Sequence, residues 1–562
     1  MKNIRFIMLI LLSAVMVSSC SNKKEKMKNE LVDFIRKHDS VYIPLYKQAT
    51  LASWNAAISG TPEDFKKSEE AQMELVKLFA NKESFQKLDS IKISGMITDS
   101  LLARQLDVLY RAFLMAKADT AKLNAIVRMQ TEIEQKYGNF RAEVKGKKLS
   151  DNEVENILRN SKNTEEQKEV WIAQKKIGPV VSEDIKKLVA LRNEVAKDLG
   201  FKNYHEMSLT LSEQDPQQIL SLFDELDSLT KNAFSQVKGE IDGYFVGYYG
   251  LKSKEELMPW NYQNRFFQEA PKIYEVDLDR FYKDKNLETL TVSFYDGIGL
   301  PVDDIIRNSD LYEKSGKNQH AFCTDIDNKG DVRVLCNIQP NAMWMNTMLH
   351  EFGHAVFDKN IDTNLPFILR DPAHTFTTEA IAMIFGRFSS NPQWLKDMVG
   401  ISEEEKLKIA DNCFKTLRME QLVFSRWAQV MYRFEKSMYE TPDQDLNQLW
   451  WDLVEKYQLL KRPAGRNEPD WATKIHIASY PCYYHNYLLG ELLASQLYYY
   501  IVGNIIKSGD YKFQSFAGNK EIGNYLKERI FMPGARYYWN DMIEKATGEK
   551  LTPKYYAKQF VE

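Results

Sequence analysis

The hydrophobic periodicity of the chain constrains its fold most strongly. Between about residues 27 and 250, apolar side chains recur every three or four positions, as in Leu102, Leu106, Leu109 and Phe113, with charged residues between them. This spacing is typical of amphipathic helices. Glycine (25) and proline (17) form about 7% of the 562 residues, against a usual share of about 12%. The sequence therefore predicts a mainly α fold.

Composition narrows the class of protein further. Hydrophobic residues make up 44% and aromatic residues 12% of the chain, which is enough for a large core and argues against global disorder. The 75 basic and 78 acidic side chains leave a net charge of −3. Because nucleic-acid-binding domains carry a strongly basic face, we expect no nucleic-acid partner. No feature of the sequence predicts a protein partner.

The first twenty residues have the pattern of a targeting segment. Lys2 and Arg5 precede an apolar run at residues 7–17, and small residues then lead to Cys20. The pattern resembles a bacterial lipoprotein signal, in which the chain is cleaved before the cysteine and a lipid is attached to its sulfur. An ordinary signal peptide or a signal anchor is the alternative interpretation.

On the lipoprotein interpretation, residues 1–19 are the signal peptide, Cys20 carries a lipid anchor and residues 20–29 form a flexible tether. The protein is then expected in the cell envelope, anchored to the outer membrane or to a periplasm-facing leaflet. No later stretch has 18 apolar residues without charge, so no further membrane span is expected.

Four other cysteines are too few for a disulfide scaffold. Cys323 and Cys336 flank a turn-like sequence at residues 328–331, and their pairing is left open. Two β-like runs, residues 320–326 and 332–336, surround that turn and predict a hairpin. A helix is expected to begin after it, at Pro340 or Asn341.

Six of the eight histidines lie between residues 320 and 485, and two of them form the sequence His350-Glu351-Phe352-Gly353-His354. Residues four apart on a helix lie one turn above each other, so both imidazoles can ligate one Zn²⁺. Glu351 is rotated about 100° from His350, so its carboxylate can act as a general base on water without ligating the ion. An amphipathic helix with two hydrogen-bonded histidines is the alternative interpretation.

A catalytic zinc site needs a third protein ligand and one open position. Glu379 is the candidate, because it is the one carboxylate in a nearly apolar helical segment at residues 377–385. A charge in such surroundings is costly unless it is paired or bound to metal. Two alternatives stay open: a buried salt bridge from Glu379 to Arg387, and His374 as the third ligand.

Two further candidates support this site. Asp358, one turn after His354, is in position to accept the second imidazole hydrogen and fix the ring, although a solvated charge at the helix end explains it equally well. Downstream, His476, Tyr484 and Tyr487 lie in a segment rich in hydrogen-bond donors. A phenol there can donate to the oxyanion formed when water attacks a peptide carbonyl, whereas an aromatic core stripe is the structural alternative.

These motifs resemble the angiotensin-converting-enzyme (peptidyl-dipeptidase A) family of zinc metallopeptidases in a bacterial lipoprotein form, and more distantly the thimet oligopeptidases. The resemblance also rests on residues 198–204 and on two adjoining stretches, 439–447 and 449–458. It covers most of residues 30–550 and is strongest from 310 to 495.

The resemblance implies a role for each matching residue. His350, His354 and Glu379 match the zinc ligands, and Glu351 matches the general base. His320 and Ala321 match a strand that binds the substrate backbone, and His476 matches a histidine that contacts the peptide. Lys474 and Gln263 match the residues that bind the C-terminal carboxylate of the substrate. Tyr484 and Tyr487 match two tyrosines beside the cleaved bond, of which Tyr487 is the oxyanion donor.

The chain also departs from the family pattern. The family often has an aspartate four residues after the third ligand, where this chain has Met383, so Asp358 is the substitute. Animal members have a chloride-binding arginine between the two tyrosines, where this chain has His485 and Asn486. The register of this segment also allows Tyr483 in place of Tyr484.

The sequence therefore predicts one large ellipsoidal helical domain, residues 30–562, with a deep central cleft and a small hairpin beside the zinc helix. Residues 30–250 supply a lid and the first half, and residues 251–562 the half with the zinc site. The expected activity is hydrolysis of short peptides, with release of C-terminal dipeptides if Lys474 binds the terminal carboxylate. An oligopeptidase that cuts internally is one alternative, and a non-catalytic peptide-binding surface lipoprotein is another.

Overall fold

The computed structural model describes the backbone of residues 2–274 and 276–561, and side chains from residue 23 onward. The chain is mainly α-helical, as the periodicity predicts. In the described residues, strands occur as two short antiparallel hairpins, β1–β2 and β3–β4.

The first half of the chain is a series of helices interrupted by the first hairpin. Its elements are α1 (Lys2–Ser59), α2 (Pro62–Phe79), α3 (Lys82–Ser94), α4 (Ser100–Ala116), α5 (Thr120–Asn139), β1 (Ala142–Val144), β2 (Lys147–Leu149), α6 (Asp151–Asn160), α7 (Thr164–Lys175), α8 (Ile177–Asp198), α9 (Tyr204–Leu211) and α10 (Pro216–Tyr249). The helical series is interrupted after Ser59, where α1 ends, and at residues 145–146, which form the β1–β2 turn.

The second half begins with short helices and the β3–β4 hairpin and then becomes helical again. Its elements are α11 (Asp279–Tyr282), α12 (Leu287–Gly297), α13 (Asp303–Asn308), β3 (Phe322–Asp325), β4 (Val332–Leu335), α14 (Ala342–Lys359), α15 (Thr375–Arg387), α16 (Pro392–Trp394), α17 (Glu403–Glu440), α18 (Leu446–Leu453), α19 (His476–Ser479), α20 (His485–Ile501), α21 (Lys520–Leu526), α22 (Trp539–Thr547) and α23 (Lys554–Phe560).

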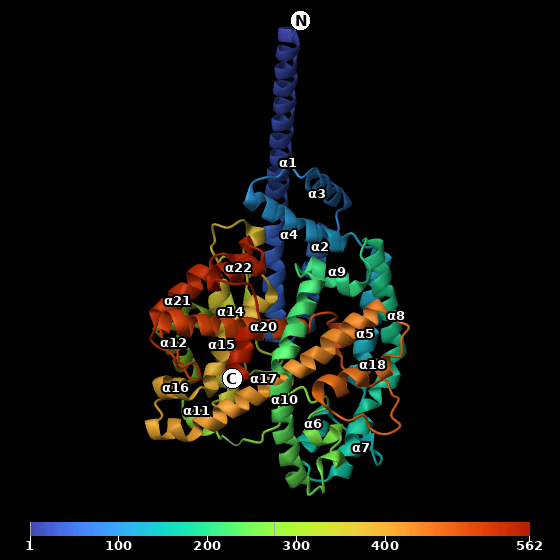
Figure 1. The fold of residues 1–562 in the computed structure, drawn as a ribbon, viewed down its shortest axis with the longest axis vertical. Coiled ribbons are helices and arrows are strands. Elements are labelled where there is room, and N and C mark those ends of the chain that lie inside the picture. Colours follow the sequence, from blue (N-terminus) through green and yellow to red (C-terminus); the bar gives the residue numbers. More distant parts are fainter. Residues whose placement is uncertain (1, 275, 562) are drawn as a thin grey trace.

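The helices are arranged around two long ones. Figure 1 shows α10 running between a group that contains α14, α15 and α20 and a group that contains α5, α7 and α8, and α17 crossing α10 diagonally from the first group toward the second. The N-terminal part of α1 extends away from the rest. This arrangement brings the C-terminal segments against the N-terminal helices, because α8 packs on residues 470–473 and α5 on α19.

Residues 20–29 differ from the prediction of a flexible tether, because they lie within α1. The sequence from Lys23 to Glu30 is rich in lysine and glutamate, which favour helix, and Lys26 and Glu30 form an ion pair of 3.9 Å one turn apart. The side chains of residues 1–22, including Cys20, are outside the described residues. Among the described residues, no helix combines the length and hydrophobicity that a membrane span requires.

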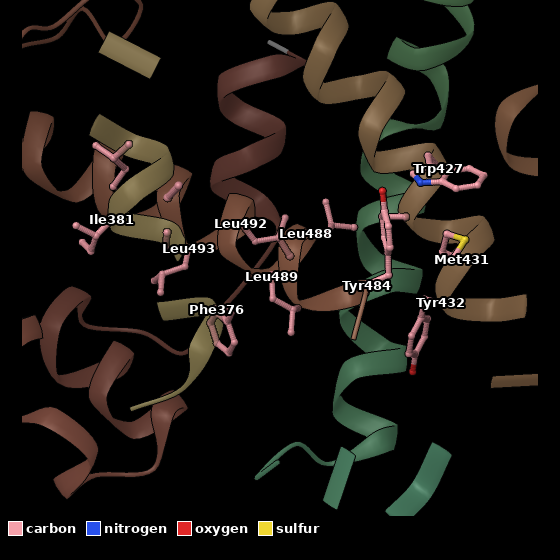
Figure 2. Packing of buried hydrophobic residues seen from close by; sticks show 14 of the residues in the cluster. Phe376, Ile381, Trp427, Met431, Tyr432, Tyr484, Leu488, Leu489, Leu492 and Leu493 are labelled. Atoms are coloured by element: carbon pink, nitrogen blue, oxygen red, sulfur yellow. The ribbon is translucent and has the colours of Figure 1, made fainter. Parts of the chain in front are cut away.

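One hydrophobic core holds the site helices in place. The helix α20 packs between α15 and α17 and contributes fully buried leucines on both sides. Figure 2 shows Leu488, Leu489, Leu492 and Leu493 of α20 between Phe376 and Ile381 of α15 and the aromatic and methionine side chains of α17. Because such interiors are closely packed, α15 has little freedom to move relative to α20.

Candidate metal centre and peptide cleft

The helix α14 carries the His-Glu-x-x-His sequence and begins where the sequence predicts. Asn341 caps it, since its Oδ1 accepts a hydrogen bond of 2.9 Å from the backbone N–H of Trp344. Its apolar residues are buried in the core: Met345, Met348, Leu349, Phe352, Ala355 and Val356. The histidines on the other side of the helix face a cavity of about 590 Å³.

A close crossing between α14 and α15 positions the third candidate ligand. A Cβ atom on Gly353 would lie 2.8 Å from the Cα of Ala382, so the two backbones meet at a residue without a side chain. A second helix also approaches α15 through a glycine, since a Cβ on Gly490 of α20 would lie 3.3 Å from the Cβ of Glu379. Glu379 is therefore held between two helices that approach through glycine.

His350, His354 and Glu379 form one cluster. Their potential ligand atoms all lie within 4.8 Å of one another, and Glu379 Oε2 is 3.7 Å from His350 Nε2 and 3.9 Å from His354 Nε2. Ligands about 2.0–2.2 Å from a tetrahedral zinc ion lie roughly 3.4 Å apart. The three donors thus fit Zn²⁺ with a small adjustment.

The protonation of the cluster also suits a cation. Burial lowers the pKa of His350 to about 4 and, together with His350, that of His354 to about 3. Both rings are therefore neutral at pH 7, which is the form that ligates metal. Burial, with a smaller contribution from Glu491, raises the pKa of Glu379 to about 7.

The structure contains neither a salt bridge between Glu379 and Arg387 nor His374 as the third ligand, the two alternatives for this region. Arg387 forms its ion pair with Glu491, so it does not neutralise Glu379. His374 is outside the cluster and precedes α15, where its Nδ1 accepts a hydrogen bond of 3.3 Å from the backbone N–H of Phe376. Glu379 is therefore the residue that completes the donor set.

The predicted partner of His354 is corrected by the structure. His354 Nδ1 is 2.7 Å from the Oγ1 of Thr378, the residue directly before Glu379. Asp358 instead has the thiol of Cys323 as its neighbour, with Sγ at 4.0 Å from Oδ2. The α14–α15 crossing brings Thr378 to the ring, whereas Asp358 faces β3. Position on one helix, the basis of the Asp358 prediction, does not reveal this contact.

Glu351 opens into the same cavity as the cluster. Its side chain is 9% exposed, and burial together with Glu379 raises its pKa to about 8. A carboxylate so buried next to a possible metal ion is suited to accept and release a proton near neutral pH.

Strand β3 forms one wall of this cavity, which Ala321 to Asp325 line. His320, expected to start the strand, lies before it, is exposed and is not part of the lining. Its backbone N–H donates to the side chain of Asn318, so the chain turns there and the strand begins at Phe322. Cys323 and Cys336 are free thiols.

Lys474 lies in an aromatic pocket beyond the cluster. Its Nζ is 5.3 Å from the ring centroids of Phe266 and Trp427 and 5.4 Å from that of Tyr484. It donates a hydrogen bond of 2.5 Å to Oε1 of Gln268. The glutamine that contacts Lys474 is thus Gln268, five residues after Gln263, the position expected from the resemblance.

Gln263 ends a short helical turn with φ of 57°, and it lines a neighbouring cavity together with Gln268. The expected role requires a glutamine, and positions 263 and 268 both have one. Because the alignment of residues 260–268 to the family is loose, the sequence alone does not distinguish the two. The pocket around Lys474 thus contains a glutamine that the sequence did not identify.

A row of aromatic side chains runs from Tyr487 to Lys474. The ring of Tyr487 is 5.4 Å from those of both Tyr483 and Tyr484, and the ring of Tyr484 is 5.2 Å from that of His476. Burial, with Tyr483 and Glu379, raises the pKa of Tyr487 to about 12, so its hydroxyl keeps a proton to donate. Burial and Lys474 lower the pKa of His476 to about 4, so its ring is neutral.

The geometry resolves the register of the two tyrosines. Tyr484 contacts Lys474, whereas the hydroxyl of Tyr483 is 3.5 Å from Thr375 Oγ1 at the start of α15. The assignment of Tyr484 to the lysine pocket therefore agrees with the contacts, and Tyr483 belongs to the side of the cleft that faces α15.

A helix with His350, Glu351 and His354, joined by a carboxylate from a second helix, defines the site of a zinc metallopeptidase. Comparison with known proteins identifies the family. The peptidase M2 model, described as angiotensin-converting enzyme, matches residues 25–255 and 269–557. The chain belongs to this family of zinc metallopeptidases.

Individual relatives are distant. The chain is 23% identical over 433 residues to the angiotensin-converting enzyme of Mesocricetus auratus, a match that covers 71% of this chain and 32% of the relative. The enzyme of Oryctolagus cuniculus is 21% identical over 546 residues, with coverages of 92% and 41%. Oligopeptidase A of Haemophilus influenzae is 28% identical over 229 residues, with coverages of 31% and 32%. The chain thus spans about a third to two fifths of the length of these relatives.

Proposed function

We propose that this protein is a zinc-dependent peptidase of the cell envelope that releases dipeptides from the C-termini of short peptides. The observation that carries the proposal is the environment of Lys474. Its side chain is 7% exposed, and among the described residues no carboxylate lies within 4.0 Å of its Nζ.

A buried cation without a carboxylate partner favours an anionic ligand, since an isolated buried charge is costly. Tyr484 lies beside both Lys474 and the expected oxyanion donor, since its ring is 5.4 Å from Lys474 Nζ and 5.4 Å from the ring of Tyr487. With the C-terminal carboxylate of the substrate at Lys474 and Gln268 and the cut bond beside Tyr487, we expect a short leaving fragment, a dipeptide as in the peptidyl-dipeptidases that the sequence resembles.

The residues of the chain supply the other parts of the reaction. The free edge of β3 can hold the extended substrate backbone. Zinc at His350, His354 and Glu379 would supply Lewis acidity toward the scissile carbonyl and lower the pKa of water. Glu351 takes the proton from the attacking water and returns it to the leaving amine. Tyr487 donates its hydroxyl hydrogen to the developing oxyanion.

Mass spectrometry of peptide fragments tests the proposal. Wild type should release C-terminal dipeptides from free peptides, lose activity with a chelator and cleave C-terminally amidated peptides with a sharply raised KM. Lys474→Met should raise KM for free peptides, while Lys456→Met, at an exposed lysine, should not. Equal KM values for free and amidated peptides would reject the dipeptidase assignment.

The second candidate is an oligopeptidase that cuts internally, favoured by the match to oligopeptidase A. Fragments longer than two residues on both sides of the cut, from free and amidated peptides alike, would select it. A peptide-binding protein without catalysis is a third candidate. Glu351→Gln with zinc retained should abolish cleavage, and a wild type equally inert on a peptide library would favour the binding protein.

The location in the envelope rests on the sequence around Cys20 alone. Lipidation predicts that radiolabelled palmitate is incorporated into the wild-type chain and not into Cys20→Ala. If neither protein incorporated the label, the proposed lipid anchor at Cys20 would be rejected.

A further inference from the structure

The cavity that contains the metal cluster has an acidic wall, formed by Asp325 of β3, Asp358 near the end of α14 and Asp371 before α15. All three line the same cavity of about 590 Å³ as His350 and Glu351. Asp371 is exposed, and the other two are partly buried.

Among the described residues, no lysine, arginine or histidine forms an ion pair within 4.0 Å with any of these three carboxyl groups. Burial, then Asp325 and Asp371, raise the pKa of Asp358 well above its usual value. The side chain of Asn328 donates a hydrogen bond to the carboxyl group of Asp371. One cationic side chain, Arg370, is found in the described lining, and its Nε donates to the carbonyl of Leu365.

The acidic wall is not arranged as a second metal site. Among the described residues, His350, His354 and Glu379 are the one group of three potential ligands whose donor atoms lie within 4.8 Å of one another. Asp325 also uses both of its oxygens on its own turn, accepting from the backbone N–H groups of Asp327 and Gly330. Carboxylates spread along a wall suit a larger, multidentate cation, such as a guanidinium or an ammonium group.

A second observation points to a ligand in this cavity. Glu351 is about nine-tenths buried, opens into the cavity and has no hydrogen-bond partner among the described residues. A buried carboxylate of this kind is satisfied by something that enters the cavity. The acidic wall is therefore part of a space that receives a ligand.

The wall is separate from the carboxylate pocket, because neither Lys474 nor Gln268 lines this cavity. If the C-terminal carboxylate of the substrate lies at Lys474, as proposed above, the residues before the cut bond extend into the cavity along β3. The acidic wall then faces the N-terminal part of the peptide.

We propose that the acidic wall, chiefly Asp358 and Asp371, binds a cationic group of the substrate on the N-terminal side of the cut bond, an inference that rests on the proposed function. The group is the side chain of arginine or lysine, or the α-ammonium of a very short peptide. The enzyme is thereby selective for basic peptides.

Paired peptides test this inference. Each pair carries arginine or citrulline at one of the two positions before the cut bond, since citrulline keeps the shape of arginine without its charge. Acetylation of the N-terminus separates the two sources of charge. Wild type should prefer the arginine peptide by roughly tenfold in kcat/KM, as expected for a charge-assisted hydrogen bond. Preference for a free over an acetylated N-terminus instead would identify the α-ammonium as the ligand.

The variants Asp358→Asn and Asp371→Asn should remove this preference and leave kcat/KM for the citrulline peptide nearly unchanged. Asp443→Asn, at an exposed aspartate on the loop after α17, is the matched control and should behave as wild type. Circular dichroism melting shows whether each variant folds. Equal kcat/KM for arginine and citrulline peptides with both free and acetylated N-termini would overturn the inference.

Binding measurements separate this inference from the proposed function. The same peptide pairs are titrated into the zinc-loaded Glu351→Gln variant by calorimetry. If wild type cuts neither peptide, the proposed function fails, and tighter binding of the arginine peptide still supports the acidic wall. Equal affinity for both peptides, with either N-terminus, rejects the acidic wall even if cleavage occurs.

Discussion

Gly353 and Ala382 mark the point where the two ligand-bearing helices touch. A Cβ on Gly353 would lie 2.8 Å from the Cα and 3.2 Å from the backbone N of Ala382. The glycine stands between Glu351 and His354, and Ala382 stands one turn after Glu379 on α15. The distance between the histidines and the third ligand is therefore set by the absence of one side chain.

Gly353→Ala should separate α14 from α15, because the backbone of Ala382 cannot yield as a flexible side chain would. We expect a loss of about 1–3 kcal/mol in unfolding free energy, typical of overpacking, and a weaker affinity for zinc. Thermal melting and competitive chelator titration measure the two effects. Gly247→Ala in α10, where a Cβ meets nothing within 4 Å, should instead stabilise by about 0.5–1 kcal/mol. Unchanged zinc affinity in Gly353→Ala would contradict the argument.

Thr378 holds the ring of His354 through the contact of 2.7 Å at Nδ1. Thr378→Val keeps the shape of the side chain and removes the hydroxyl. Loss of such a partner typically weakens metal affinity by about 10–100-fold. Thr378→Ser should restore most of the affinity, and chelator competition with the two variants provides the measurement. Equal zinc affinity in the valine and serine variants would show that the hydroxyl is dispensable.

The fold and the site differ in how far the sequence predicts them. Helical periodicity and the shortage of glycine and proline predict the fold class, and the spacing of His350 and His354 predicts their common helix face. The sequence did not predict Thr378, because its contact with His354 joins two helices that are distant in sequence. It did not predict Gln268, because the segment around it aligns loosely with the family. For Thr378 a signal exists, since it directly precedes Glu379 and must lie near the same cluster. For Gln268 no such signal exists, because Gln263 offers the same side chain five residues earlier and only the contact with Lys474 distinguishes them.

Substrate affinity should depend on the protonation of Lys474. Burial lowers the pKa of Lys474 to about 8, while Glu269 opposes and Arg265 adds to this effect. Below pH 8 the side chain is charged and binds a carboxylate, and above it the charge is lost. KM for peptides with a free C-terminus should therefore rise above about pH 8, by up to roughly tenfold per unit.

Two comparisons isolate the role of Lys474 in this profile. Amidated peptides have no carboxylate to bind, so their KM should lack the rise. Lys474→Arg should move the rise to higher pH, because arginine stays charged. Parallel profiles for free and amidated peptides would assign the pH dependence to another group.

Arg192 of α8 stabilises the segment that carries Lys474, His476 and Tyr484. The guanidinium is 1% exposed and donates to the carbonyl of Ala478 at 2.6 Å and to Gln130 Oε1 at 3.2 Å. Gln130 in turn donates to the carbonyl of Ser479. Because both carbonyls lie just after His476, Arg192→Leu should loosen residues 476–484 and leave the metal cluster intact.

We expect Arg192→Leu to lower kcat/KM by about tenfold or more, since small displacements of positioning groups have large kinetic costs, while zinc content and zinc affinity stay at the wild-type level. Hydrogen exchange should become faster in residues 476–484. Arg433→Leu, at a partly buried arginine paired with Asp224, is the matched control and should change neither quantity. If Arg192→Leu instead lost zinc together with activity, the arginine would support the whole fold rather than this segment, and its role in positioning the substrate pocket would be rejected.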